Sequence, residues 1–317
     1  MKFAILSDIH GNLPAFKAVL SDAEAQGAIQ YLFLGDYFRD LPWVNETVEL
    51  LRCLENVVAI RGNNEDRLLS YSKKKQTYLN FEQFGLDKWN YKNMSQENVD
   101  YLVNLPKTTA IEDSGYKIHL IHSSNIFFRR PKNLIFHTSY FRFLIETTSF
   151  TKEDYSATAR NALLTRPDVM ADICALPEGI YLNGHNHMQF HMEYDNKLFI
   201  NPGSCGLAAD GDVTAAYTLL SCMANGCNVE ERRVPYDVDK TVAHLQNSSL
   251  GAEAPVWAAV IERNILTGKD HMAPLLYQIY ETAKKYGETS TPVSNAVWRL
   301  GVETWDIDKP VPEEFFR

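Results

Sequence analysis

The chain has 317 residues, 45% hydrophobic and 22% charged, and its 40 acidic against 31 basic side chains give a formal net charge of −9. This is the composition of an ordinary folded protein, and it excludes a disordered, collagen-like or disulfide-rich chain. The acidic balance and the lack of an extended basic block argue against binding to the phosphate backbone of nucleic acid.

The cysteines and the N-terminal residues bear on the cellular compartment. The five cysteines are odd in number and contain no C-x-x-C pair, so reduced thiols are expected. The apolar run after Met1 is shorter than the hydrophobic segment of a signal peptide, and no run of about 18 apolar residues occurs. We therefore expect a cytoplasmic protein without a membrane partner.

Short apolar runs along the chain predict buried strands, because runs of this length suit strands better than helices. They lie at residues 3–6, 31–34, 57–60, 118–121, 180–182 and 198–200. Apolar residues at three- and four-residue spacing predict amphipathic helices at 13–20 and 44–54. Further on, apolar runs at 215–220 and 229–234 flank Asn225-Gly226, a hairpin signal. The order predicts an α/β protein with a mixed sheet or two stacked sheets.

Two intervals, 65–105 and 125–178, lack strand signals and are expected to be helical cap insertions. We place one large domain at residues 1–235 and a helical C-terminal extension at 236–317, where helical periodicity continues. The aromatic residues of that extension, such as Trp257 and Trp298, indicate packing or an oligomer surface rather than a part of the active site. The oligomeric state stays open.

Side chains of the type that binds metal ions follow five of the predicted strands. They are Asp8 with His10, Asp36, Asn63, His122, and His185 with His187. Because the carboxyl ends of strands in an open α/β sheet line one crevice, these distant residues can converge. Glycines immediately before Asp36, Asn63 and His185 permit sharp turns and close approach.

These ligand types suit a pair of transition-metal ions, because imidazole binds Mn, Fe and Zn and one carboxylate can bridge two ions. Such a pair clamps the attacking and leaving oxygens of a displacement at phosphorus, and it makes hydroxide available near neutral pH. The pattern therefore indicates hydrolysis of a phosphate ester or anhydride.

The motifs together resemble the calcineurin-like metallophosphoesterase superfamily over residues 1 to about 235. They are Ser-Asp-Ile-His-Gly-Asn at 7–12, Leu-Gly-Asp at 34–36, Arg-Gly-Asn-Asn-Glu at 61–65, His122, Gly-His-Asn-His at 184–187 and Asn-Pro-Gly-Ser at 201–204. The first and last are similar to those of the small bacterial phosphodiesterase branch, which includes diadenosine-polyphosphate hydrolases. The resemblance implies a two-sheet α/β/β/α sandwich with helical cap insertions.

The resemblance also implies roles for the seven ligand-type residues. Asp8, His10 and His187 would hold one divalent or trivalent ion, Mn, Fe or Zn. Asn63, His122 and His185 would hold a second such ion, and Asp36 would bridge the two. Attack by metal-bound hydroxide on a small phosphorylated substrate, of which nucleotides are one class, is the activity that this arrangement implies.

Asn64 and Ser123 depart from the superfamily's pattern. Asn64 stands where the superfamily's phosphatases carry a histidine that is proposed to donate a proton or stabilise the transition state, so we expect it to orient a phosphoryl oxygen instead. Ser123 replaces the usual glycine after His122, and its hydroxyl is either a phosphate contact or neutral.

Three arginines are candidates for substrate phosphates, with surface ion pairs or solvation as the alternative. Arg39 follows Asp36, and Arg129 and Arg130 precede Pro131 in the second insertion. Aromatic residues in both insertions are suited either to helix packing or to stacking on a nucleobase.

The first functional hypothesis is a dinuclear metal-dependent hydrolase of phosphodiester or phosphoanhydride bonds. A phosphomonoesterase or protein phosphatase is an alternative, and Asn64 counts against it. A noncatalytic scaffold for protein association is another, and it is disfavoured because the ligand set is complete.

Overall fold

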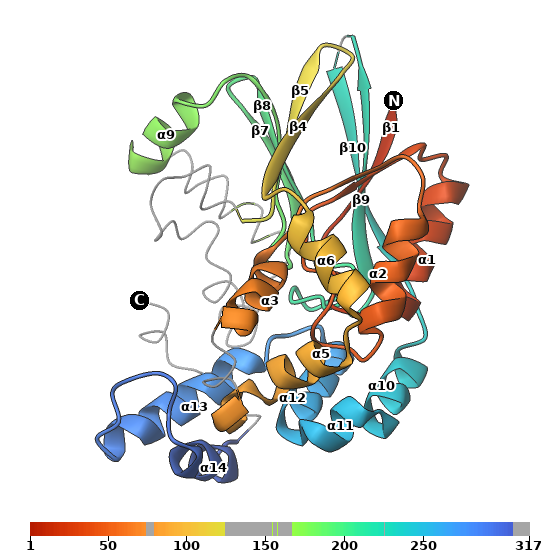
Figure 1. The fold of residues 1–317 in the computed structure, drawn as a ribbon. Coiled ribbons are helices and arrows are strands. Elements are labelled where there is room, and N and C mark those ends of the chain that lie inside the picture. The colour runs from red at the N-terminus through yellow and green to blue at the C-terminus, as the bar shows by residue number, and fades with distance from the viewer. Residues whose placement is uncertain (74–78, 124–153, 155–156, 158–166, 225, 307–317) are drawn as a thin grey trace.

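The computed structural model describes residues 1–73, 79–123, 154, 157, 167–224 and 226–306. Two five-stranded sheets pack face to face, with helices outside them and at one end (Figure 1). The predicted two-sheet α/β/β/α sandwich with a helical C-terminal region is confirmed. Among the described residues, no helix combines the length and the apolar content that crossing a membrane requires.

The first sheet has the order β10-β9-β1-β2-β3. Its strands are β1 (Lys2–Leu6), β2 (Gln30–Phe33), β3 (Val57–Ala59), β9 (Ala215–Met223) and β10 (Gly226–Val234). β1, β2 and β3 are parallel, whereas β9 runs antiparallel to both β1 and β10. The predicted hairpin is present, with Gly226 paired to Met223 at its turn.

The second sheet has the order β4-β5-β6-β8-β7. Its strands are β4 (Thr108–Asp113), β5 (Tyr116–Ile121), β6 (Gly179–Leu182), β7 (Gln189–Tyr194) and β8 (Lys197–Pro202). The two edge strands, β4 and β7, were not predicted. β4 has no buried residue and β7 alternates buried with exposed positions, so neither carries the apolar run of a central strand.

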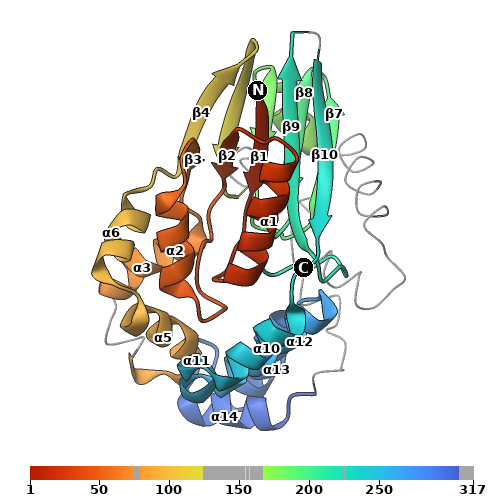
Figure 2. The same ribbon diagram turned by 90° about the vertical axis from the view of Figure 1, so that its right-hand side faces the viewer.

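The core between the sheets follows from the period of two along each strand. Phe3 and Ile5 of β1 belong to the apolar cluster that the second sheet also lines, whereas Ala4 and Leu6 belong to the cluster on the helical side. Two helices cover that side of the first sheet, α1 (Leu13–Ala25) and α2 (Val44–Cys53) (Figure 2). The Asn12 side chain caps α1 by accepting the N–H of Ala15.

The remaining helices fall largely where the sequence predicts them. The first insertion holds α3 (Asn63–Lys73), η1 (Glu82–Phe84), α5 (Gly85–Asn93) and α6 (Gln96–Asn104). Most of the second lies outside the described residues, and its described end contains α9 (Pro167–Cys174). The C-terminal region holds α10 (Val238–Asn247), α11 (Ser249–Glu253), α12 (Pro255–Thr267), α13 (Met272–Lys285) and α14 (Asn295–Glu303).

The C-terminal helices pack against the rest of the protein rather than standing apart. Trp89 of α5 and Trp257 of α12 belong to the same apolar cluster as Phe16 of α1. The indole N–H of Trp89 donates to Ser249 Oγ at 3.0 Å, and Trp43 stacks on His244 with ring centroids 4.3 Å apart. These contacts fix the C-terminal helices beyond the carboxyl ends of β1, β2 and β3 (Figures 1 and 2).

Candidate metal centre

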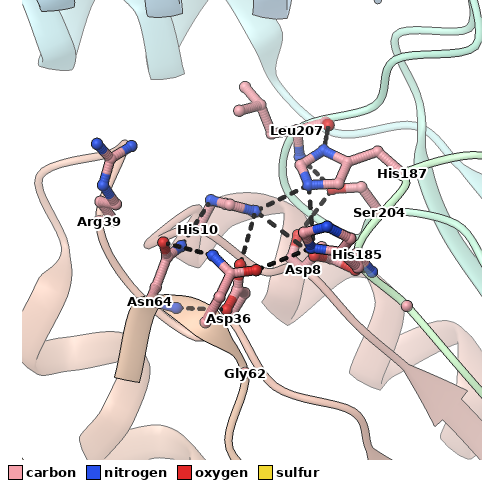
Figure 3. A network of polar contacts seen from close by, with 12 residues as sticks. Asp8, His10, Asp36, Arg39, Gly62, Asn64, His185, His187, Ser204 and Leu207 are labelled. Carbon is pink, nitrogen blue, oxygen red and sulfur yellow. Dashed lines mark hydrogen bonds and ion pairs between the residues drawn. The ribbon is translucent and has the colours of Figure 1, made fainter. Parts of the chain in front are cut away.

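The structure brings the seven ligand-type side chains together. Figure 3 shows five of them, Asp8, His10, Asp36, His185 and His187. The first sheet supplies Asp8, His10, Asp36 and Asn63, which follow β1, β2 and β3. The second supplies His122, His185 and His187, which follow β5 and β6. The site therefore exists only because the two sheets pack with the carboxyl ends of their parallel strands on the same side.

The backbone at these positions has an unusual conformation. Positive φ angles occur at Asp8 (54°), His10 (52°), Asp36 (57°), His185 (75°) and His187 (59°). A left-handed conformation costs about 1–2 kcal/mol for a residue with a side chain. Neighbouring loops hold it in place, since the N–H groups of Asp8 and His10 donate to the carbonyls of Gly35 and Asp36 at 3.0 Å. Strain held in this way is typical of functional sites.

Two of the motif glycines are required by the close approach of other groups. A Cβ on Gly62 would lie 2.2 Å from Asp36 Oδ1, and one on Gly184 would lie 1.9 Å from Ser7 Oγ. Any larger residue would therefore displace the loops that carry the ligand-type side chains. This agrees with the close approach that the sequence predicts at these glycines.

Asp8, His10 and His187 form the first cluster, with one ligand atom of each within 4.8 Å of the others. His10 Nε2 and His187 Nε2 lie 3.1 Å apart, and Asp8 Oδ1 lies 3.3 Å from the latter. Burial raises the pKa of the Asp8 carboxyl, but the imidazoles of His187 and His10 outweigh it and hold the pKa well below its usual range. Asp8 is thus a buried carboxylate that requires positive charge beside it.

Asp36, Asn63, His122 and His185 form the second cluster. Asn63 Oδ1 lies 3.0 Å from His122 Nε2 and 2.8 Å from His185 Nδ1, and Asp36 Oδ1 lies 3.5 Å from His122 Nε2. Burial, aided by His122, lowers the pKa of His185 to about 4. His185 is therefore a neutral imidazole at physiological pH, which is the form that binds a metal ion.

The outward-facing nitrogens of three imidazoles are fixed by acceptors. His10 Nδ1 donates to Asp40, His122 Nδ1 donates to the Leu34 carbonyl at 2.8 Å, and His187 Nδ1 donates to the Leu207 carbonyl at 2.6 Å. In its neutral form each ring therefore presents the lone pair of Nε2 to the centre, as metal-binding histidines do.

When these rings are neutral, lone pairs face each other without a donor between them. This holds for the two Nε2 atoms of His10 and His187, and for His122 Nε2 opposite Asn63 Oδ1. Within the described part of the chain, buried Asp8 Oδ1 also has no hydrogen-bond partner. Converging acceptors of this kind repel one another unless a proton or a metal ion lies among them, so the donor set fits metal ions that displace those protons.

Asp40 is a supporting residue that sequence reasoning missed. Its carboxylate binds His10 Nδ1 through one oxygen and Arg39 through the other at 3.2 Å. Burial lowers the pKa of His10, but Asp40 and Asp36 outweigh it and raise the pKa to about 10. A metal ion on His10 must therefore displace a proton, so metal binding competes with protonation. In the sequence, the only indication of this role that we note is that Asp40 lies four residues after Asp36.

Glu65 has a similar supporting role. Its carboxylate accepts the backbone N–H groups of Asp36 and Tyr37 at 3.0 Å and of Gly62 at 2.6 Å. Burial and the nearby Asp36 charge raise its pKa to about 7. Glu65 ends the motif at 61–65, so its presence was visible in the sequence although its role was not.

The motif at 201–204 forms hydrogen bonds with the loops that carry Asp8 and His185. Ser204 Oγ donates to the Asp8 carbonyl at 2.7 Å and accepts the Leu207 N–H at 2.8 Å. Asn201 Nδ2 donates to the Gly184 carbonyl at 3.0 Å. These bonds join the Asp8 loop to the loop of His185 and His187 without contacting the ligand atoms.

A cavity of about 280 Å³ opens beside the metal-type residues, just below the range of about 300–1,000 Å³ common for ligand pockets. Arg39 and buried Asn64 line it, as the sequence suggested. The Asn64 N–H donates to Asp36 Oδ1 at 2.9 Å, and Arg39 is held between Asp40 and Asp87. Ser123 is not among the described lining residues.

Arg129 and Arg130 lie outside the described residues. The C-terminal region, in contrast, lines the cavity with Asn264, Lys269, Asp270 and Met272. The tryptophans of this region, Trp257 and Trp298, are buried in the core, as expected for packing.

Comparisons with known proteins agree with this geometry. A model described as the calcineurin-like phosphoesterase superfamily domain matches residues 1–224. An uncharacterised protein of Methanocaldococcus jannaschii is 27% identical over 271 residues, covering 80% of this chain and 94% of that protein. A metallophosphoesterase of Sphaerobacter thermophilus is 23% identical with a TM-score of 0.57, covering 84% of this chain and all (100%) of that chain.

A hypothetical protein of Pyrococcus horikoshii has the same fold at 18% identity, with a TM-score of 0.59 over 85% of this chain and 99% of that chain. The family model covers well over half of the sequence, including every ligand-type residue. This chain belongs to the calcineurin-like phosphoesterase superfamily, and it is a metal-dependent phosphoesterase.

Proposed function

We propose that the protein is a dinuclear metal-dependent hydrolase of phosphodiester or phosphoanhydride bonds, with nucleotides as a substrate class. The observation that carries this proposal is the convergence of ring nitrogens and oxygens whose lone pairs face each other. The superfamily typically binds two divalent metal ions, and the described residues contain two overlapping groups of candidate ligands, Asp8 with His10 and His187, and Asp8 with Asp36 and His122.

In this proposal Asp8, His10 and His187 hold one ion, Asn63, His122 and His185 hold the other, and Asp36 lies between them. Asp36 is the residue suited to bridge, because Asp36 Oδ2 lies 4.0 Å from His10 Nε2 and Asp36 Oδ1 lies 3.5 Å from His122 Nε2. Two such ions polarise a phosphoryl group and activate water as the nucleophile.

The chain's own residues position the substrate. Asn64 is buried beside both clusters, and its Oδ1 accepts Asn63 Nδ2 at 3.2 Å. Its Nδ2 makes only long contacts, with the Phe38 carbonyl at 3.4 Å and His10 Nδ1 at 3.5 Å, so it can donate to a phosphoryl oxygen. Arg39 lines the same cavity with its guanidinium held by two carboxylates. An amide does not release a proton at neutral pH, so Asn64 orients the substrate and does not protonate the leaving group.

Because Asn64 does not protonate the leaving group, we expect the enzyme to favour diesters and anhydrides over monoesters of poor leaving groups. The assay compares hydrolysis of bis-p-nitrophenyl phosphate with that of p-nitrophenyl phosphate, using chelator-stripped protein reloaded with Mn²⁺. Diadenosine tetraphosphate, run in parallel, tests the branch that the sequence resembles. We expect metal-dependent turnover that favours the diester or the dinucleotide. Preference for the monoester, or no turnover of any substrate by protein shown to hold metal, would overturn the proposal.

A further inference from the structure

Three basic side chains line the cavity beside the metal-type residues, Arg39, Arg67 and Lys269. Arg39 is paired with Asp40 at 3.2 Å and Asp87 at 3.3 Å, and Arg67 lies 3.8 Å from Asp87. Within the part of the chain that the structure describes, the Lys269 ammonium has no hydrogen bond or ion pair. Lys269 is therefore the cation of this cavity whose charge is left for a ligand.

Lys269 lies on the loop between α12 and α13, which the main chain fixes firmly. Gly268 ends α12 in a left-handed conformation (φ 64°), and its carbonyl accepts the Gly211 N–H at 2.9 Å. The N–H of Lys269 itself donates to Thr267 Oγ1 at 3.3 Å. The loop is thus tied to the segment after β8, and the half-buried lysine has a set position on the cavity wall.

Side chains of α12 and of the loop add further bonds. Asn264 Oδ1 accepts the His271 N–H at 2.8 Å, and Asp270 Oδ1 accepts the Met272 N–H at 3.0 Å. Asn264 and Asp270 are buried. Because these bonds hold the loop, only the Lys269 side chain has to be ordered when it contacts a ligand.

The cavity lies between two walls of different chemistry. His10, Asp36 and His187 lie on the wall formed by the strand ends, whereas Lys269 comes from the C-terminal helices beyond them (Figures 1 and 2). A substrate whose reacting phosphate lies at the metal-type residues directs its adjoining groups into the remaining space. Lys269 lines the same cavity of about 280 Å³ as His10, Asp36 and His187, so the group next to the reacting phosphate shares this space with the lysine.

We propose that Lys269 binds a second phosphate group of the substrate, so that the C-terminal region selects polyphosphorylated over singly phosphorylated substrates. An ammonium is a compact point charge that binds phosphate oxygens through charge-assisted hydrogen bonds. This inference rests on the proposed hydrolase function and adds to it a substrate class, phosphate compounds with at least two phosphate groups.

The test compares two chromogenic substrates, the p-nitrophenyl ester of thymidine 5′-monophosphate and the γ-p-nitrophenyl ester of thymidine 5′-triphosphate. The selectivity is the ratio of kcat/KM for the second to that for the first. In Lys269→Ala we expect this ratio to fall about tenfold or more, as the loss of a charge-assisted hydrogen bond requires. Lys269→Arg, which keeps the charge, should retain most of the ratio.

Lys285→Ala is the matched control, because Lys285 lies exposed at the end of α13, outside the cavity. Calorimetric binding of thymidine 5′-monophosphate and thymidine 3′,5′-bisphosphate to the metal-loaded proteins gives a readout that is independent of turnover. Weaker binding of the bisphosphate alone in Lys269→Ala would support the inference. An unchanged ratio and unchanged binding in Lys269→Ala would overturn it, even where turnover of bis-p-nitrophenyl phosphate by the wild type upholds the hydrolase function.

Discussion

The two walls of the cavity are built in different ways. On the wall of the strand ends, five ligand-type residues with positive φ are held by bonds between neighbouring loops. On the C-terminal wall, a helix end and a short loop present one unpaired cation, Lys269, with ordinary backbone geometry. The first wall is specialised for one chemistry at the cost of strain, whereas the second can change with little effect on the first. We infer that reaction type and substrate choice are separated between them.

Removal of the Asp36 carboxylate should abolish metal binding on the wall of the strand ends. Asp36→Ala deletes the group between the two clusters, so we expect loss of metal and a fall in kcat/KM of at least about a thousandfold, since metal ions contribute several kcal/mol to such reactions. Metal content by mass spectrometry and turnover of bis-p-nitrophenyl phosphate measure both effects. Glu193→Ala is the control, because Glu193 is an exposed residue of β7. Full activity in Asp36→Ala would contradict the assignment.

A smaller effect is expected from the support of His10. Asp40→Asn removes the carboxylate that fixes the His10 ring. We expect metal affinity to fall by about 10–100-fold, which is the usual effect of removing a residue that orients a metal-binding histidine. Asp87→Asn is a matched control, because Asp87 also binds Arg39 but does not contact His10. Chelator competition gives the metal affinity of both variants. Equal affinity in the two would mean that Asp40 acts through Arg39 alone.

Asn64→Ala separates substrate orientation from metal binding. The side chain contacts no ligand atom strongly, so we expect both metal equivalents to remain and kcat to fall about tenfold, the worth of one hydrogen bond to a charged group. Exposed Asn104→Ala, whose amide only caps its own helix turn, should match the wild type. Loss of metal from Asn64→Ala would show that the residue is structural.

The smallest effect should come from the C-terminal wall. Gly268→Ala and Gly287→Ala both place a side chain at positive φ, but only at Gly268 does the new Cβ meet backbone, 3.0 Å from atoms of Gly211 and Asp212. Each should lose about 1 kcal/mol of unfolding free energy from the backbone conformation. Denaturant unfolding should show a further loss in Gly268→Ala, which should also change the selectivity ratio while leaving metal content intact. A changed selectivity ratio in Gly287→Ala, but not in Gly268→Ala, would show that the position of the Lys269 loop does not determine selectivity.

The sequence predicted the central strands and the ligand-type residues because both follow local rules. A buried strand needs an apolar run, and the metal-type side chains follow such runs directly, as Asp8 follows β1 and His185 follows β6. The edge strands β4 and β7 were missed because pairing on one side only does not require that run. Glu65 and Asp40 were visible as residues, but their roles depend on which loops touch.

The C-terminal wall could not be predicted for a different reason. Lys269 has no motif around it, and it reaches the cavity only because Trp257 and its neighbours dock the helices against α5 and α1. Long-range packing of this kind produces no pattern in the sequence around the residue that it positions. The same reasoning applies to Asn264, which reads as an ordinary polar position within α12 yet is buried at the cavity.

The most direct test of the central claim is a titration of chelator-stripped protein with Mn²⁺ while p-nitrophenol release from bis-p-nitrophenyl phosphate is followed. Two clusters of ligand atoms predict that the rate rises with added metal and saturates at two ions per chain. Turnover that is already complete in the metal-free protein, or saturation at one ion, would contradict a dinuclear centre.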